Sequence, residues 1–156
     1  MEKLIFDTGH LITCGKYQIR DQYLMDIVTG NFKVIIPEVV KKEAIDYGKP
    51  RNDAFVIEEY LNAGKINIEV VDNLNEKQKK LLDACNLKNG DRAVVELYYS
   101  KNIGNVVVDD HVLYFYLDRL GIPKKMFPDL IKDLVVRSKI DKEHALQILE
   151  IIKTRY

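Results

Sequence analysis

Short apolar runs, each ending at a polar or turn-forming residue, divide the sequence into regular segments. Four of these runs predict β-strands, at residues 4–6, 34–36, 66–71 and 106–108. They are rich in aliphatic and β-branched residues and are bounded by Asp, Asn or Pro. Such short runs are typical of strands that are buried on both faces of a sheet.

Apolar positions three and four residues apart predict helices between and after these strands. The predicted helices span residues 21–29, 38–47, 53–63, 76–85, 92–101 and 112–120, and two more fill residues 127–156 around a break near 138–141. Strands that alternate with helices of this length pair in parallel through right-handed crossovers. The pattern therefore predicts a three-layer α/β/α fold with a central, mostly parallel sheet of four or five strands.

No internal repeat, low-complexity segment or flexible linker interrupts the sequence. Its 156 residues match the length of one ordinary domain. We expect residues 1–156 to form a single domain, with a core at about residues 3–122 and a C-terminal helical extension at about residues 127–156.

The composition, 47% hydrophobic and 31% charged, is that of a globular protein. The 24 Lys and Arg residues balance the 24 Asp and Glu residues, so the overall charge does not attract nucleic acid. This sum leaves out bound metal ions, so a carboxylate cluster that holds metal could form a local positive surface that the net charge does not show. Cys14 and Cys85 match no metal or redox spacing, and no apolar run is long enough for a signal peptide or a membrane span. We expect a cytoplasmic protein with reduced thiols and no membrane partner.

Three acidic residues directly follow predicted strands. Asp7 ends the first run, and Asp109 and Asp110 follow the fourth. In an open parallel sheet, ligands bind at the carboxyl ends of the strands. Each aspartate also has a structural alternative as the cap of the next helix, and for Asp110 that alternative is as strong as a functional role.

Glu43 lies within the apolar face of the predicted helix 38–47. It is four residues after Val39, three after Val40 and four before Tyr47. These spacings put it on their face of the helix. A carboxylate on a buried face is costly unless it is paired or bound to metal. The alternative is a glutamate at the edge of the face that reaches solvent or pairs with a lysine.

Asp91 follows Gly90 and starts on the buried face of its helix. It lies three, four and seven residues before Val94, Val95 and Tyr98. Taken alone, it fits an N-cap slightly better than a functional acid. The combination is more informative, because four separate segments each bring an acid toward one edge of the same sheet.

Several carboxylates in one place need a cation. Two of them about 4 Å apart repel by roughly 4 kcal/mol at a typical effective dielectric. Oxygen ligands without His or Cys select a hard ion, Mg²⁺ or Mn²⁺. Such an ion suits the hydrolysis of phosphodiester bonds, because it activates water and stabilises the leaving oxygen.

The ordered set of acid-bearing segments resembles the PIN-domain family, in particular its stand-alone archaeal and bacterial members. The resemblance extends over about residues 3–122 and is carried by residues 4–8, 36–43, 90–97, 107–110 and 120–122. It implies a PIN-like fold and an endoribonuclease that hydrolyses RNA with Mg²⁺ or Mn²⁺. Many members are the toxin of a toxin–antitoxin pair.

The resemblance also implies roles for individual residues. Thr8 would orient the Asp7 carboxylate from behind, and Asp109 would be a further metal ligand and the rival of Asp110 for the last position. The implied catalytic and metal-binding acids are Asp7, Glu43, Asp91 and Asp110.

Some positions depart from the family pattern. Val108 stands where a Thr or Ser is common, and His10 stands where a small polar residue is usual. His111 is placed to contact substrate or metal, although a partly exposed histidine at a helix start is the favoured interpretation. The fifth strand of the family is not visible in residues 123–126.

The expected partners are an RNA substrate, an antitoxin protein and a second copy of the chain in a homodimer. Lysine groups at residues 41–42, 77–80 and 124–125 are candidate phosphate contacts, although solvated helix faces are the favoured interpretation. A second hypothesis is a catalytically silent PIN-like domain that binds RNA or a protein, in which the acids serve as caps or ion-pair partners.

Overall fold

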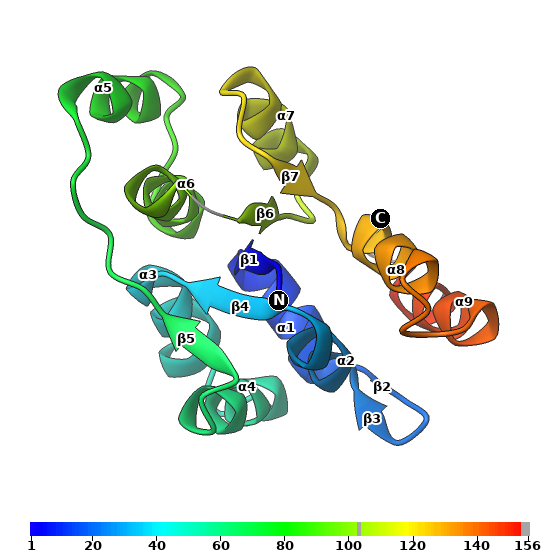
Figure 1. Cartoon of the computed structure of the whole chain (residues 1–156). Helices are drawn as coiled ribbons and strands as arrows, with labels where there is room; N and C mark the ends of the chain where they lie inside the picture. Colours follow the sequence, from blue (N-terminus) through cyan, green and yellow to red (C-terminus); the bar gives the residue numbers. More distant parts are fainter. Residues whose placement is uncertain (103, 154–156) are drawn as a thin grey trace.

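A parallel β-sheet occupies the centre of the molecule (Figure 1). In the computed structural model, which describes residues 1–102 and 104–153, five strands are arranged in the order β5-β4-β1-β6-β7. Every neighbouring pair is parallel, with Ile5 opposite both Ile35 and Val106. The strands are Lys3–Phe6 (β1), Lys33–Ile36 (β4), Ile66–Ile68 (β5), Asn105–Val107 (β6) and Lys124–Lys125 (β7).

Helices cover both faces of the sheet, which confirms the predicted α/β fold (Figure 1). One face carries α1 (Thr8–Lys16), α2 (Leu24–Asn31), α3 (Glu38–Lys41) and α4 (Asn52–Asn62). The other carries α5 (Glu76–Ala84), α6 (Asn89–Lys101) and α7 (His111–Arg119). The closing helices α8 (Phe127–Val136) and α9 (Lys142–Ile152) lie beside α1 and α2.

The strand order contains one reversal of direction, between β1 and β6. From β1 the chain moves outward to β4 and β5, then crosses back to β6 on the other side of β1. The loops that leave β1 and β6 therefore turn to opposite faces of the sheet. Ligands of open α/β sheets bind in the crevice at such a point, beyond the carboxyl ends of the strands.

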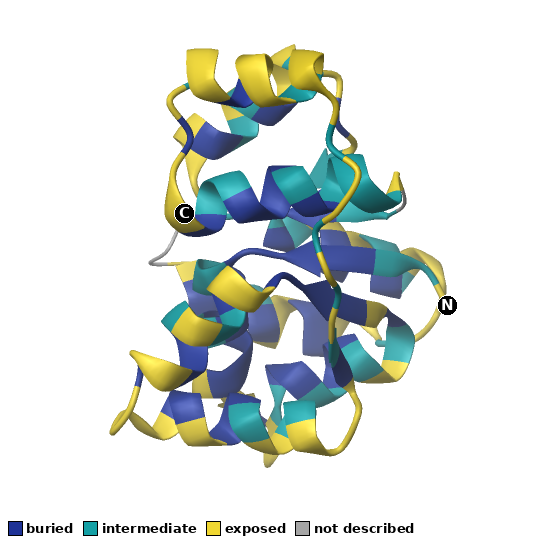
Figure 2. Ribbon diagram, turned by 90° about the vertical axis from the view of Figure 1, so that its left-hand side faces the viewer, coloured by how far each residue is buried: buried dark blue, intermediate teal, exposed yellow. Residues whose placement is uncertain are grey.

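The central strands β1, β4 and β6 are buried on both faces apart from their first residues, as the uninterrupted apolar runs predicted. The edge strands β5 and β7 are partly exposed. Residues 4–6 and 106–108 have no exposed side chains, and Figure 2 shows the sheet as the darkest part of the ribbon. The closing helices belong to the same hydrophobic cluster, to which they contribute Phe127, Leu134 and Ile148. The helical extension thus packs directly on the α/β core.

Several segments differ from the sequence-based expectation. Helix α1 was not predicted, and the helix expected at 21–29 starts only at Leu24. Arg20 and Asp21 adopt positive φ values of 54° and 60°, which form the turn of a small hairpin, Gln18–Ile19 (β2) with Gln22–Tyr23 (β3). Strand β5 ends at Ile68, because beyond it the edge of the sheet opens to solvent and Val70 is 70% exposed.

The fifth strand, which the sequence did not show, is present as β7. It consists of two lysines, which pair with β6. Two lysines lack the apolar pattern by which a strand is predicted, but lysine is common in strands at the edge of a sheet. The two closing helices are confirmed. The second was expected to extend to residue 156, and α9 ends at Ile152, while residues 154–156 lie outside the described part of the chain.

No helix in the described part of the chain is both long and apolar enough to span a membrane.

The packing of the closing helices predicts a difference between two Leu→Ala substitutions. Leu134 is fully buried in α8, whereas Leu146 of α9 is 67% exposed. We expect Leu134→Ala to lower the free energy of unfolding by about 2–5 kcal/mol. Leu146→Ala, the matched control, should change it by no more than about 0.5 kcal/mol. Urea denaturation measures both, and equal effects would contradict the packing of α8 on the core.

Candidate functional site

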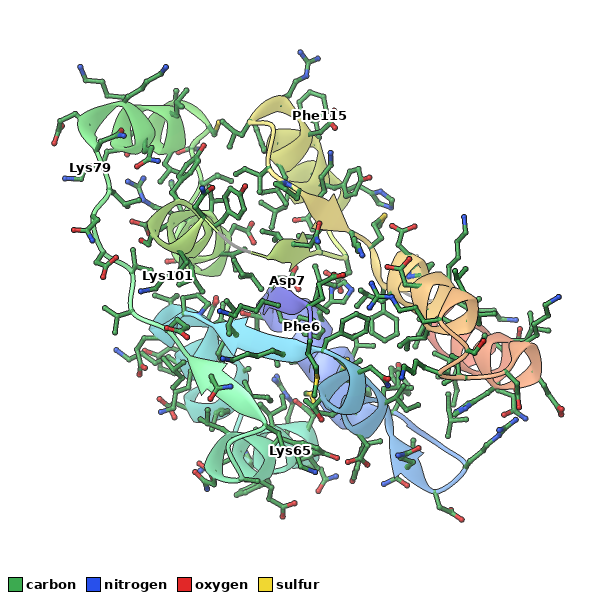
Figure 3. The ribbon with its side chains drawn as sticks, viewed as in Figure 1. Phe6, Asp7, Lys65, Lys79, Lys101 and Phe115 are labelled. Atoms are coloured by element: carbon green, nitrogen blue, oxygen red, sulfur yellow. The ribbon has the colours of Figure 1, made fainter. Side chains whose placement is uncertain are left out.

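Asp7 joins the end of β1 to the start of α1. Its extended backbone (φ −80°, ψ 171°) makes it the N-cap of α1, and its Oδ1 accepts a hydrogen bond from the His10 backbone N–H at 2.9 Å. The carboxylate is nonetheless almost buried, at 6% exposure, and Figure 3 shows Asp7 near the middle of the molecule. The capping alternative is therefore correct for Asp7, and it also holds the carboxylate at the carboxyl edge of the sheet.

Asp109 and Asp110 follow β6, the neighbour of β1, and point to different places. Asp110 is the N-cap of α7 and accepts a hydrogen bond from the Val112 backbone N–H at 2.8 Å. Asp109 turns toward α1, where its carboxylate lies against Gly9. A Cβ on Gly9 would come within 2.8 Å of both Asp109 oxygens, so the glycine makes this approach feasible.

Glu43 reaches the same region from the other side of β1. Its Oε1 accepts a hydrogen bond from the Thr8 hydroxyl at 2.9 Å, so Thr8 orients Glu43 and not, as expected, Asp7. The helix predicted at 38–47 is interrupted, because residues Lys42–Asp46 form a π-helical turn. The expected apolar face is wrong in part, since Tyr47 is 77% exposed and Val39 39% exposed.

Gly90 allows the start of α6 to approach Glu43 closely. A Cβ at this position would overlap Glu43 Oε1 and would lie 3.4 Å from the Thr8 hydroxyl oxygen. Two glycines on different elements, Gly9 and Gly90, thus leave room for acidic side chains from distant parts of the chain.

Asp91 lies in the first turn of α6 but is not its N-cap, because the helix begins at Asn89 with Lys88 as the cap. The pKa of Asp91 is raised to about 6, first by burial and then by the charges of Asp110, Asp7, Glu43 and Asp109. A helix N-terminus favours an acid by about 0.3–1 kcal/mol. Burial and repulsion by the other carboxylates therefore outweigh the helix dipole here.

One cavity of about 310 Å³ collects these groups. All five acids named from the sequence, Asp7, Glu43, Asp91, Asp109 and Asp110, line it together with Thr8. Its remaining lining residues are Gly9, Lys88, Asn89 and Gly90. The cavity lies at the carboxyl ends of β1 and β6, where the strand order reverses.

A family model described as a PIN domain matches residues 3–149. The chain belongs to the PIN-domain family. The match confirms the resemblance and extends it from residue 122 through most of α9. No curated protein matched the sequence in a search. PIN domains are generally nucleases that use divalent metal ions, so the family implies a nucleic acid as the substrate.

The cavity of this PIN domain fits a divalent cation. Its donors are carboxylate oxygens from four segments, and their mutual repulsion adds to burial in raising the pKa of Asp91. A cation among them would replace that repulsion by attraction. The donor set thus agrees with the metal requirement of the family.

Sequence reasoning missed three features of the site. His10 is fully buried beside Asp7, and its Nδ1 lies 3.2 Å from Asp7 Oδ1. A prediction of helix α1 would have indicated the burial of His10, because His10 precedes the buried Cys14 by four residues and lies on the same face of the helix. The cavity-lining position of Lys88 and the close approach at Gly9 carry no signal in one sequence.

His111 behaves as its structural alternative predicted, whereas Lys124 and Lys125 form the half-buried edge strand β7 and not a solvated helix face. His111 is exposed at the start of α7. Lys41 pairs with Asp46, Lys124 with Asp118, and Lys125 with Glu2 and Asp133. In Figure 3, Lys79 lies beside α5, away from Asp7.

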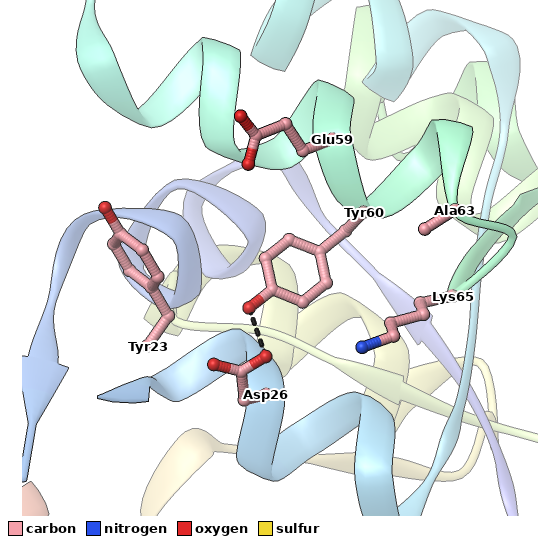
Figure 4. A pocket seen from close by; sticks show the side chains of 6 residues that line it. All are labelled: Tyr23, Asp26, Glu59, Tyr60, Ala63 and Lys65. Carbon is pink, nitrogen blue, oxygen red and sulfur yellow. Dashed lines mark hydrogen bonds between the residues drawn. The ribbon is translucent and has the colours of Figure 1, made fainter. Parts of the chain in front are cut away.

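A second, smaller pocket of about 210 Å³ lies between α2 and α4, away from the acids (Figure 4). There the Tyr60 hydroxyl donates a hydrogen bond to Asp26, and the Lys65 ammonium lies 5.5 Å from the centre of the Tyr60 ring. Burial, followed by the bond to Asp26, raises the pKa of Tyr60. These groups satisfy one another, and nothing about them indicates a ligand.

The raised pKa of Asp91 predicts a pH-dependent stability. The unfolded chain has an ordinary Asp pKa near 3.9, so between about pH 4 and pH 6 the folded state binds more protons than the unfolded state. The contribution of Asp91 to stability therefore falls as the pH rises through this range. In metal-free buffer at about pH 7.5, Asp91→Asn should raise the free energy of unfolding by on the order of 1 kcal/mol, a value reduced for solvent screening of this half-buried group.

The gain should vanish below about pH 3, where Asp91 is protonated in both states. Asp83→Asn is the matched control, because Asp83 is exposed and pairs with Arg92 at 2.7 Å, so its loss should destabilise slightly. Urea denaturation as a function of pH measures both. A loss of stability in Asp91→Asn at about pH 7.5 would contradict the carboxylate cluster.

Proposed function

We propose that this PIN domain is a Mg²⁺- or Mn²⁺-dependent endoribonuclease that hydrolyses phosphodiester bonds of RNA. The observation that supports this most is the convergence of Asp7, Glu43, Asp91, Asp109 and Asp110 on one cavity. Acids that served only as caps would have no reason to share a cavity, and Glu43 and Asp91 cap no helix.

In this proposal the carboxylates coordinate the ion, and hydrogen bonds from surrounding residues orient the carboxylates. Asp7, Glu43, Asp91 and Asp110 are the proposed catalytic ligands, with Asp109 as a further ligand. A bound divalent ion supplies Lewis-acid stabilisation of charge on the phosphoryl group and lowers the pKa of water. The Asp7 cap bond to His10 N–H and the Thr8 bond to Glu43 fix the direction of two of these side chains.

Lys88 is the cationic side chain among the described residues that line the cavity. It is exposed, and no ion pair of Lys88 is found in the described part of the chain. We assign it to a phosphate of the substrate, which the acids alone would repel. A contact between Lys88 and one phosphate needs no overall excess of basic residues, so it is compatible with the net charge of zero.

The role as a toxin, the antitoxin and the homodimer are further parts of the proposal. The toxin role rests on the family resemblance. A protein partner is supported by an apolar groove between α8 and α9, lined by Ile131, Val135, Ala145 and Leu149 among others. Val136 and Leu146, which also line the groove, are 74% and 67% exposed, and exposed apolar patches mark interaction sites. Light scattering of the purified chain tests the homodimer.

Asp7→Asn tests the nuclease proposal with little risk to folding, because Asn caps a helix as well as Asp does. With Mn²⁺ and end-labelled single-stranded or hairpin RNA, we expect cleavage to fall by at least about 100-fold, since several kcal/mol of charge stabilisation depend on the ion. DNA of the same sequence shows whether the substrate class is correct.

Asp141→Asn is the matched control for this substitution. Asp141 caps α9 and accepts a hydrogen bond from the backbone N–H of His144, three residues later, as Asp7 does from His10. It lies far from the cavity in sequence and does not line it. Equal cleavage by Asp7→Asn and the wild type would remove the catalytic role of Asp7. Absence of Mn²⁺-dependent cleavage by the wild type would favour the silent domain.

A further inference from the structure

His10 occupies an unusual position for a polar side chain. Its ring is fully buried, with Phe6 edge-on at 5.9 Å between ring centres and Phe127 tilted at 5.5 Å. Both phenylalanines are themselves fully buried. Two aromatic walls from β1 and α8 therefore fix the imidazole and keep it from turning to solvent.

The imidazole lies close to two carboxylates. One ligand atom each from His10, Asp7 and Asp109 lie within 4.8 Å of one another. His10 Nδ1 is 3.2 Å from Asp7 Oδ1. Gly9 lies between these residues in the chain, and its missing Cβ is what admits the Asp109 carboxylate.

This arrangement matches the dimensions of a metal coordination sphere. Two adjacent ligands of an octahedral ion, each about 2.1 Å from it, lie about 3 Å apart, and opposite ligands lie about 4.2 Å apart. The separation of His10 Nδ1 from Asp7 Oδ1 fits adjacent ligands. The widest separation in the group, at most 4.8 Å, exceeds the span of opposite ligands by about 0.6 Å, which a small side-chain rotation closes.

We infer that His10 is a nitrogen ligand in a metal subsite with Asp7 and Asp109, and that it makes the site favour Mn²⁺ or a later first-row transition ion over Mg²⁺. Mg²⁺ is a hard ion that takes oxygen ligands, whereas imidazole is a ligand of transition metals. The inference rests on the proposed function in sharing the ligands Asp7 and Asp109. It replaces the oxygen-only ligand set expected from the sequence by a mixed one.

The competing structural role is a histidine that hydrogen-bonds to Asp7 without binding metal. Electron spin-echo spectroscopy of Mn²⁺ bound to the full chain separates the two, because a coordinated imidazole imposes ¹⁴N modulation on the echo. The inference predicts this modulation in the wild type and its loss in His10→Gln. The wild-type spectrum is decisive even if the variant does not fold.

Affinity gives a second readout. His10→Gln should weaken Mn²⁺ binding by at least about tenfold, the smaller of the losses known for residues that merely support a ligand. Mg²⁺ affinity, measured by competition, should stay within about twofold. His144→Gln is the matched control, because His144 is also nearly buried and follows its capping aspartate by three residues.

The outcomes distinguish this inference from the proposed function. Mn²⁺ binding without ¹⁴N modulation, and with unchanged affinity in His10→Gln, overturns the nitrogen ligand and leaves the carboxylate site intact. Equal weakening of Mg²⁺ and Mn²⁺ in His10→Gln overturns the selectivity. Absence of any Mn²⁺ binding by the wild type overturns both the inference and the metal-dependent nuclease.

Discussion

Repulsion among carboxylates at one edge of the sheet is the constraint on which the rest of the site depends. The parallel order β4-β1-β6 brings the ends of three neighbouring strands together, and α6 adds a fourth acidic segment. Burial and, after it, this repulsion raise the pKa of Asp91 to about 6, although a helix N-terminus should lower it. Hydrogen bonds and close packing around the cavity keep the acids in place despite their mutual repulsion.

These hydrogen bonds and contacts differ from one acid to the next. Asp7 and Asp110 are fixed by capping bonds to α1 and α7, and Glu43 by the Thr8 hydroxyl. Gly9 and Gly90 permit the close approach of backbone to carboxylate. The closing helices also contribute, because Phe127 of α8 packs on the ring of His10 beside Asp7. The C-terminal helices are thus connected to the site by direct contact.

Much of this was predictable from the sequence because strong local patterns agree with the fold. The apolar runs of β1, β4 and β6 and the acids after β1 and β6 follow directly from burial on both faces of a parallel sheet. Glu43 was placed correctly for an incomplete reason, since a π-helical turn and not a regular apolar face directs it. The functional roles of the acids stay predictions.

The remainder could not be predicted because the deciding interactions are tertiary. β7 consists of two lysines that are a strand only by pairing with β6. Helix α1 contains two glycines and three β-branched or hydroxyl residues, which weaken its helical signal. The choice between Asp109 and Asp110 depends on side-chain direction: Asp109 groups with Asp7 and His10, while Asp110 caps α7.

Titration calorimetry of Mn²⁺ binding, in two buffers with different ionisation enthalpies, tests the central claim most directly. Burial raises the pKa of Asp91 to about 6 and the charges of the neighbouring acids add to the rise, so a cation bound among these acids must displace the proton that Asp91 carries at that pH. We predict release of about half a proton or more per ion near pH 6, and clearly less near about pH 8. Binding without proton release near pH 6, or no binding at all, would contradict the account.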